Sequence, residues 1–259
     1  MIPKVIHYCW FGRGEMPKLM KKCIKSWKKY CPDYQITEWN EDNFDICSTE
    51  WTKEAYEAKK YAFVADYIRL KVLFEHGGIY LDTDQELIKP LDPFLNHKAF
   101  LGFMQKSSVS MGVVGAIPKH GLIEKLFSHY ENRRFLTNGK EDKNPNTEWV
   151  SEILLKEGFV QNNQYQVINY DTHIYPQTYF CPTSCVSIED VSGPDTVSIH
   201  HWAMTWRKKS EIKTFARVRR HQTKWYRALE NARYLPNKVA RKILGDSRYE
   251  KVKKRIKND

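Results

Sequence analysis

The sequence has no uninterrupted apolar run close to the roughly eighteen residues that a membrane-spanning helix requires. Its start, MIPKVIHYCWFG, lacks the basic segment followed by a long apolar segment that is typical of a signal peptide, and it predicts a first strand instead. Internal repeats and low-complexity segments are also absent. These absences predict neither a spanning helix nor an export signal, and we therefore expect a cytoplasmic protein.

The cysteines also lack a pattern. They do not show the paired spacing of a zinc site, and the pair Cys181 and Cys185 is more typical of ordinary packing than of metal binding. A cytosolic protein keeps its thiols reduced, so we expect no disulfide framework. The six cysteines are Cys9, Cys23, Cys31, Cys47, Cys181 and Cys185.

What the sequence does contain is enough apolar material for a core, with 41% hydrophobic and 14% aromatic residues among 259. Its charge is uneven. Residues 207–259 hold 19 Lys and Arg against 5 Asp and Glu, a net charge of +14, whereas residues 1–206 hold 23 against 26, a net charge of −3. We therefore predict a catalytic domain over 1–206 and a basic helical C-terminal extension over 207–259.

Strands and helices alternate along the first part of the chain. The spacing predicts strands at 5–10 and 34–39, helices at 17–30 and 52–76, and a buried strand after Gly77-Gly78, with 86–88 as its return partner. Further strands are expected at 100–104 and 112–117, and further helices at 122–135 and 147–157. This order predicts an α/β domain with a mostly parallel sheet flanked by helices.

The stretch GGIYLDTDQEL places two carboxylates at the end of an apolar strand. Strand periodicity puts Asp82 and Asp84 on one side of the backbone, with Cα atoms about 7 Å apart. Two like charges held so close resist burial. One interpretation is a solvated turn, and the other is a divalent cation that makes the pair favourable.

Just before it, AFVADYIRLKVLFEHGG places Asp66 and Arg69 three residues apart on a predicted helix, so their side chains share a face. A surface ion pair is one interpretation. Because this is the most apolar turn of the helix, we instead expect the pair to face the same cleft as Asp82 and Asp84.

A third stretch, SIHHWAMTWRK, combines two imidazoles with two indoles at the end of an apolar strand. Core residues are the usual interpretation of such a pattern. Beside a D-x-D, however, His200 or His201 becomes a further ligand for a Mn²⁺-class cation. The indole N–H groups of Trp202 and Trp206 can donate to phosphate oxygens.

Together these stretches resemble the DXD-motif sugar transferases of glycosyltransferase family 32, with bacterial toxin glucosyltransferase domains as distant relatives. The resemblance spans about residues 1–206. The matching segments are IPKVIHYCWFG at the start, ADYIR at 65–69, GGIYLDTD at 77–84, YPQTYFCP at 175–182 and IHHWAMTW at 199–206.

The resemblance implies a GT-A fold and a transferase that retains configuration at the anomeric carbon. It implies Mn²⁺ or Mg²⁺ as cofactor, a nucleotide-sugar donor expected to be a UDP-sugar, and a saccharide or lipid-linked saccharide acceptor. Capsule or other surface polysaccharide synthesis is the implied setting.

The resemblance also implies roles for the donor-binding residues. Trp10 would lie against the nucleotide base, and Tyr80 would lie near the base or ribose. Asp66 and Arg69 would hydrogen-bond hydroxyls of the donor sugar, and Trp206 would close over the β-phosphate.

For the metal, the resemblance implies Asp84 as the direct ligand, with His200 or His201 completing the shell. Asp82 would contact ribose, sugar or the metal through water. Two departures from the family pattern bear on sugar and acceptor choice. Ser107, Ser108 or Ser110 must replace an asparagine after Met104, and 144–147, Asn-Pro-Asn-Thr, replaces a T-G-P turn.

Two other functions fit parts of the pattern. A D-x-D after a strand also resembles haloacid-dehalogenase-type phosphatases, but their pattern requires Thr or Val where this chain has Glu86. A non-enzymatic basic module is the other alternative, and the extension is too poor in aromatic residues to suggest nucleic acid. We expect the extension to bind an anionic membrane, which predicts a peripheral position on the inner face of the plasma membrane.

Overall fold

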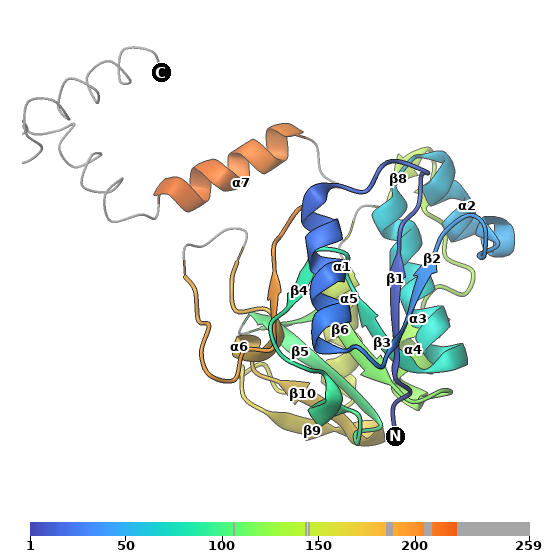
Figure 1. The fold of residues 1–259 in the computed structure, drawn as a ribbon. Coiled ribbons are helices and arrows are strands. Elements are labelled where there is room, and N and C mark those ends of the chain that lie inside the picture. Colours follow the sequence, from blue (N-terminus) through green and yellow to red (C-terminus); the bar gives the residue numbers. More distant parts are fainter. Residues whose placement is uncertain (106, 143, 145, 185–188, 205–208, 222–259) are drawn as a thin grey trace, which may run out of the picture. The chain divides into compact units, whose positions relative to one another are not determined.

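The computed structural model describes residues 1–105, 107–142, 144, 146–184, 189–204 and 209–221. Its centre is a seven-stranded sheet in the order β2-β1-β3-β6-β5-β10-β9 (Figure 1). The strands are β2 Gln35–Trp39, β1 Val5–Cys9, β3 Gly78–Leu81, β6 Ser108–Ala116, β5 Ala99–Gln105, β10 Thr172–Tyr175 and β9 Gln166–Ile168.

The sheet is mixed. Strand β1 runs parallel to β2 and β3, and β10 runs parallel to β5, as the alternation of strands and helices predicts. Strand β6 runs antiparallel to both β3 and β5, and β9 runs antiparallel to β10. The reversal at β6 follows from its short connection to β5, because a parallel crossover needs about a dozen residues or more.

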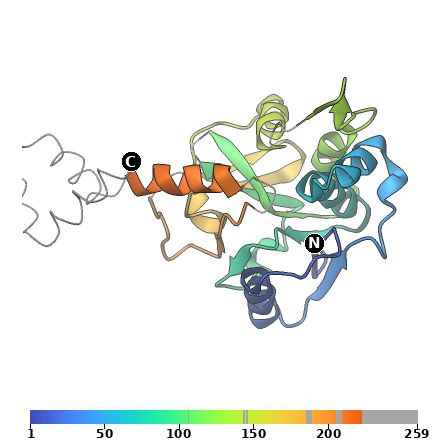
Figure 2. The ribbon, with the colours of Figure 1, turned by 90° about the horizontal axis from the view of Figure 1, so that it is seen from above.

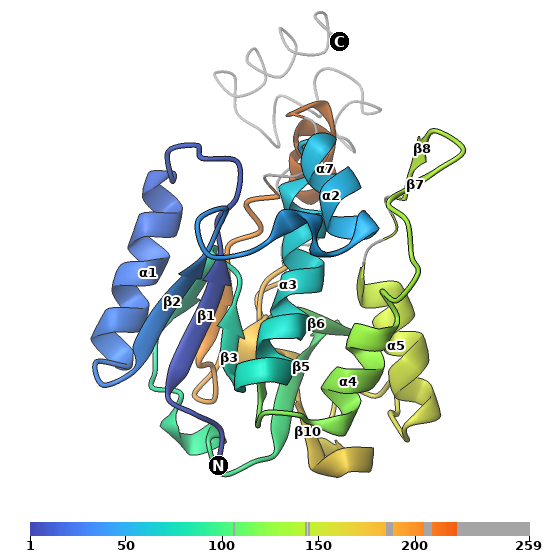
Figure 3. The ribbon, with the colours of Figure 1, turned by 90° about the vertical axis from the view of Figure 1, so that its right-hand side faces the viewer.

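Helices cover both faces of the sheet, as Figures 2 and 3 show from two directions. On one face, α2, α3, α4 and α5 pack against one hydrophobic cluster with Tyr80 of β3. On the other, α1 and α6 pack against a second cluster with Ile79 and Leu81, as strand alternation requires. The helices are α1 Lys18–Tyr30, α2 Glu50–Glu57, α3 Tyr61–His76, α4 Gly121–Ser128, α5 Asn146–Lys156 and α6 Gln177–Phe180.

Two small sheets complete this unit. Strand β4, Gln85–Leu87, pairs antiparallel with β11, Ser198–His200, and β7, Leu136–Thr137, forms a hairpin with β8, Lys140–Glu141. The prediction that 86–88 returns along the preceding strand is therefore wrong. Strand β3 already has β1 on one edge and β6 on the other, so neither edge is open to β4.

Two helix predictions also need correction. The predicted helix 52–76 is two helices, α2 and α3, because Lys59 takes a left-handed φ of 56° between them. The predicted helix 122–135 ends at Ser128.

The described residues within 1–183 and 190–204 form one compact unit, and α7, Lys209–His221, belongs to a second. Of the basic extension, the structure describes only α7. Within the described residues, no helix combines the length and apolarity that crossing a membrane requires.

Candidate active site

The candidate site lies where the parallel strands β1 and β3 end. The chain leaves β1 first for β2 on one side and later for β3 on the other, so the strand order reverses at β1. In open α/β sheets, ligands bind beyond the carboxyl ends of the strands at such a reversal. Trp10 directly follows β1, and Asp82 directly follows β3.

A tight turn carries the two D-x-D carboxylates. Strand β3 ends at Leu81, and the Gln85 backbone N–H donates to the Asp82 carbonyl over 2.9 Å. This turn, and not an extended strand, brings the carboxylates together. Asp84 is only 8% exposed, so the solvated-turn interpretation is wrong for this residue.

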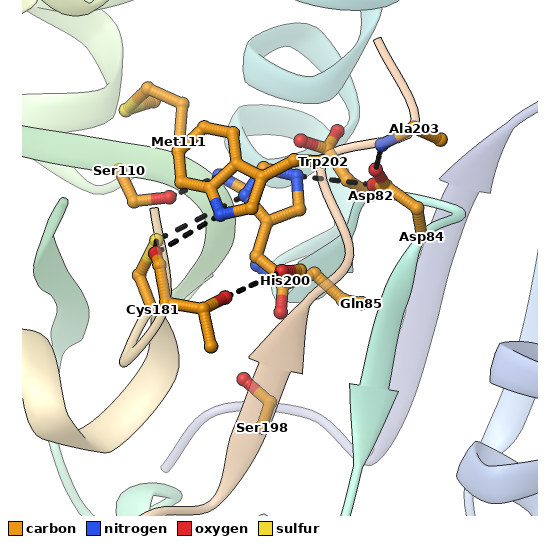
Figure 4. Close-up of polar contacts among 12 residues, drawn as sticks. Asp82, Asp84, Gln85, Ser110, Met111, Cys181, Ser198, His200, Trp202 and Ala203 are labelled. Carbon is orange, nitrogen blue, oxygen red and sulfur yellow. Dashed lines mark hydrogen bonds and ion pairs between the residues drawn. The ribbon is translucent and has the colours of Figure 1, made fainter. Parts of the chain in front are cut away.

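Asp82, Asp84 and His200 form a cluster in which each residue offers one ligand atom, and these atoms all lie within 4.8 Å of one another (Figure 4). Strand β11 brings His200 there by pairing it with Gln85, the residue after Asp84. His200 Nε2 lies 3.2 Å from Asp84 Oδ1, and the Ala203 N–H donates to Asp84 Oδ2 over 2.8 Å.

The neighbouring imidazole points elsewhere. His201 Nε2 lies 2.7 Å from Glu86 Oε2, which also accepts a hydrogen bond from Lys22 Nζ over 2.9 Å. Of the two histidines that the sequence left open, the structure therefore brings only His200 to the carboxylates. This follows from strand geometry, in which successive side chains point to opposite faces.

The electrostatics of the cluster suit a cation. Burial disfavours the charged form of Asp84. The charge of His200 and the hydrogen bond from the Ala203 N–H nevertheless hold the pKa of Asp84 below its usual value. Burial likewise opposes the charged imidazole, but Asp84 raises the pKa of His200 well above its usual value. Burial raises the pKa of Asp82 despite the charge of Arg69. Two carboxylates and an imidazole fit a divalent ion of the Mn²⁺ or Mg²⁺ class, because its charge would offset these burial effects.

Arg69 links this cluster to Asp66. Its Nη2 donates to Asp82 Oδ1 over 2.9 Å and lies 3.2 Å from Asp66 Oδ1, while its Nη1 donates to the Met111 carbonyl over 2.7 Å. The side chain is 7% exposed, so this is no surface ion pair. The predicted juxtaposition of the helical pair with the D-x-D is present, and the sugar-binding roles of Asp66 and Arg69 stay predictions.

A partner of Asp66 was missed by sequence reasoning. Asn146, the first residue of α5, donates from Nδ2 to Asp66 Oδ1 over 2.7 Å. Burial raises the pKa of Asp66 to about 6, although the charge of Arg69 opposes this. The segment 144–147 stood out only as a departure from the family pattern, and no spacing signal connects it to a residue 80 positions away.

The wall beside Asp82 is made by Gly112, Gln85 and Ser110. A Cβ on Gly112 would lie 2.9 Å from Gln85 Nε2 and 3.0 Å from Asp82 Oδ2, so only glycine fits without displacing them. Gln85 is fully buried, and neither amide atom has a partner among the described residues. Of the three serines considered as substitutes for asparagine, Ser110 lies here, with its Oγ accepting from the Gly112 N–H over 3.2 Å.

Of the residues predicted to contact the nucleotide, the structure describes Trp10 and Tyr80. The Trp10 indole is partly buried and donates from Nε1 to the Gly14 carbonyl over 2.8 Å. Tyr80 is 2% exposed, and the Arg69 guanidinium lies 4.6 Å from its ring centroid. Their nucleotide contacts stay predictions. Trp206 lies outside the described residues.

Comparison with known proteins supports the motif assignment. Residues 17–101 match the family model described as the glycosyltransferase sugar-binding region containing the DXD motif. The chain is 30% identical over 143 residues to mannosyl phosphorylinositol ceramide synthase SUR1 of Saccharomyces cerevisiae, covering 52% of this chain and 37% of that protein. It is 32% identical over 123 residues to inositol phosphoceramide mannosyltransferase 3 of Schizosaccharomyces pombe, covering 46% and 34%. The chain thus spans well under half the length of these curated relatives.

Among solved structures, the PaToxG glycosyltransferase superposes with a TM-score of 0.45 at 16% sequence identity, covering 60% of this chain and 70% of that chain.

Proposed function

We propose that this chain, which belongs to the DXD-motif glycosyltransferases of family 32, transfers a hexosyl group from a nucleoside-diphosphate sugar to an acceptor hydroxyl. The observation that best supports this proposal is that ligand atoms of Asp82, Asp84 and His200 lie within 4.8 Å of one another. The Asp66–Arg69 pair lies directly against this cluster. A site that joins a cation position to buried hydrogen-bonding carboxylates suits a diphosphate on one side and a sugar on the other. We also propose that the sheet and site follow the GT-A arrangement.

Mannose is the first sugar to test, because the relatives are named as mannosyl-transferring proteins. The base is a separate question, and the expectation of a UDP-sugar stays a prediction. For the acceptor we propose a hydroxyl on the headgroup of a lipid, since the relatives' names specify inositol phosphoceramide. A saccharide on a lipid carrier fits the same chemistry.

The cation would be held by Asp84 and His200, with Asp82 beside them. When bound, such an ion neutralises the charge that develops on a departing diphosphate. The protein's own part is orientation. Arg69 lies against Oδ1 of Asp82 and Oδ1 of Asp66, and Asn146 donates to the same Oδ1 of Asp66, so these contacts hold both carboxylates in one arrangement. Preorganised carboxylates of this kind can accept hydrogen bonds from sugar hydroxyls and favour positive charge on the ring in an oxocarbenium-like transition state.

The experiment is a donor screen with the purified full chain. GDP-mannose, UDP-glucose and UDP-galactose are each offered with Mn²⁺, Mg²⁺ or EDTA, and donor hydrolysis and thermal stabilisation are measured. We expect one donor to be turned over and to stabilise the protein only with a divalent ion. Asp84→Asn should lose both effects, and Asp195→Asn, the same change at an exposed position, should lose neither.

A screen in which no sugar nucleotide is hydrolysed or stabilises the protein with any ion would overturn the proposal. Turnover of p-nitrophenyl phosphate in the same screen would instead favour the phosphatase alternative. That alternative requires Asp82 as a nucleophile, although Arg69 holds its Oδ1.

A further inference from the structure

The outer side of α1 carries a row of lysines, which we call the lysine face. Within the helix each of these residues follows the previous one after one or three positions, so they lie on one side. All are exposed, whereas Met20, Cys23 and Trp27 on the opposite side are buried. Residues 18–30 include no Asp or Glu. The lysine face consists of Lys18, Lys21, Lys22, Lys25, Lys28 and Lys29.

The fold fixes the direction of this face. The Trp27 indole donates from Nε1 to the Gln85 carbonyl over 2.7 Å, and Ser26 Oγ accepts from the Leu87 N–H over 2.9 Å. Both bonds tie α1 to β4, and Trp27 is completely buried. The helix cannot roll without breaking them, so the lysines stay outward, on the side of the sheet opposite α3 and α4 (Figure 3).

Most of this charge is unbalanced. Lys21 pairs with Glu15 and Lys22 with Glu86, each over 2.9 Å. The other four lysines have no carboxylate partner in the part of the chain that the structure describes. Like charges three and four positions apart destabilise a helix, so the row does not serve the helix itself. An anionic surface outside the protein would attract these lysines and offset their mutual repulsion.

One lysine of the face contacts a residue that is close in sequence to the candidate active site. Lys22 reaches Glu86, and Glu86 accepts from His201, the residue after the candidate metal ligand His200. A surface that attracts α1 would therefore approach the strands β4 and β11, which also position the site.

We propose that the lysine face docks on the surface of an anionic lipid bilayer and places the site next to lipid headgroups. The choice of a bilayer rests on the proposed function, in which the acceptor hydroxyl is carried by a lipid. The chemistry of the face agrees with it. Lysine ammonium groups are point charges that attract an anionic surface without specific geometry, and each contributes at most about fivefold in affinity. The face has no arginine and no fully exposed aromatic ring, the groups that nucleic-acid surfaces use for bidentate contacts and base stacking.

The test compares two variants of the full chain with equal net charge. One replaces Lys18, Lys25, Lys28 and Lys29 by Gln. The control replaces four exposed lysines outside α1, Lys53, Lys59, Lys140 and Lys156, by Gln. Either set lowers the net charge from +11 to +7, and Gln matches Lys closely in helix propensity.

Binding is measured by co-sedimentation with phosphatidylcholine vesicles, with and without about 30% phosphatidylserine, across a salt series. We expect the natural chain to bind only the anionic vesicles, more weakly as salt rises. The lysine-face variant should bind at least about tenfold more weakly, and the control should stay within about twofold. Equal losses in the two variants, or no loss in the lysine-face variant, would overturn the proposal.

Two further measurements separate the remaining outcomes. Donor hydrolysis without vesicles should be the same in both variants and the natural chain, because none of the replaced lysines contacts the site. If no form hydrolyses any donor while vesicle binding behaves as expected, the proposed function fails and the docking surface stands. Binding of poly(U) RNA by the lysine face with no vesicle binding would overturn the bilayer as the partner.

Discussion

Removing Arg69 tests whether the site's charges are as tightly coupled as its geometry indicates. The guanidinium is 7% exposed, donates to the Met111 carbonyl and Asp82, and lies 3.2 Å from Asp66 Oδ1. Arg69→Ala leaves the partly buried carboxylates of Asp66 and Asp82 without the guanidinium that pairs with them. Breaking a buried ion pair from one side costs about 3–5 kcal/mol. We expect a loss of this size in the free energy of unfolding at pH 8, measured in EDTA so that no metal compensates.

The loss should depend on pH because of Asp66. Burial raises its pKa to about 6 in the folded protein, whereas an unfolded Asp has a pKa of about 3.9. An acid with a higher pKa in the folded state binds its proton more tightly there. Its ionisation therefore destabilises the fold as pH rises from about 4 to about 6. Without Arg69 this pKa rises further, so the loss should be smaller at about pH 4.5 than at pH 8, by at least about 1 kcal/mol.

Urea unfolding followed by tryptophan fluorescence measures this difference at both pH values. Arg13→Ala is the matched control, because Arg13 pairs with Asp42 at side-chain exposures of 62% and 68%. We expect no measurable change for it at either pH. A loss below about 1 kcal/mol for Arg69→Ala, or the same loss at both pH values, would refute the coupling argued here.

Three further predictions concern the ligands. Asp84→Asn should lower transfer at least about a hundredfold by weakening Mn²⁺ binding, while Asp195→Asn leaves both unchanged; near-normal turnover, or activity that survives EDTA, would contradict this. In calorimetric Mn²⁺ titrations, His200→Ala should weaken binding at least about tenfold and His201→Ala less than about threefold, and the reverse order would show that the wrong imidazole was assigned. Asp66→Ala should weaken sugar-nucleotide binding about tenfold but free nucleoside diphosphate less than about twofold, and equal losses would place Asp66 away from the sugar.

Local patterns in the sequence were sufficient to predict some of the residues of the candidate site. The three-residue interval places Asp66 and Arg69 on one helix face, and the apolar run before Asp82 predicts a strand that ends there. Strand alternation implies that His200 and His201 point apart. It does not say which of them faces the carboxylates, because that depends on the pairing of β11 with β4, more than a hundred positions earlier.

Features that depend on long-range register were not predictable. Asn146 meets Asp66 only because α5 packs on the same face of the sheet as α3. Gln85 is buried because β4 lies between α1 and β11, although a Gln in a D-T-D-Q-E stretch looks exposed. The break between α2 and α3 is carried by Lys59, a residue type that gives no turn signal.

The charges of the site can be counted without or with a bound metal ion, and they sum to zero only with the ion. Without a metal, the three carboxylates of Asp66, Asp82 and Asp84 face Arg69 and a His200 whose pKa is raised well above its usual value. One negative charge is left over in this count, and burial raises the pKa values of Asp66 and Asp82 although the charge of Arg69 opposes this. A divalent ion bound by a neutral imidazole cancels the three carboxylates together with Arg69. The buried side chains of the site are thus one positive charge short by themselves, and a divalent ion at Asp82, Asp84 and His200 supplies the charge that balances them.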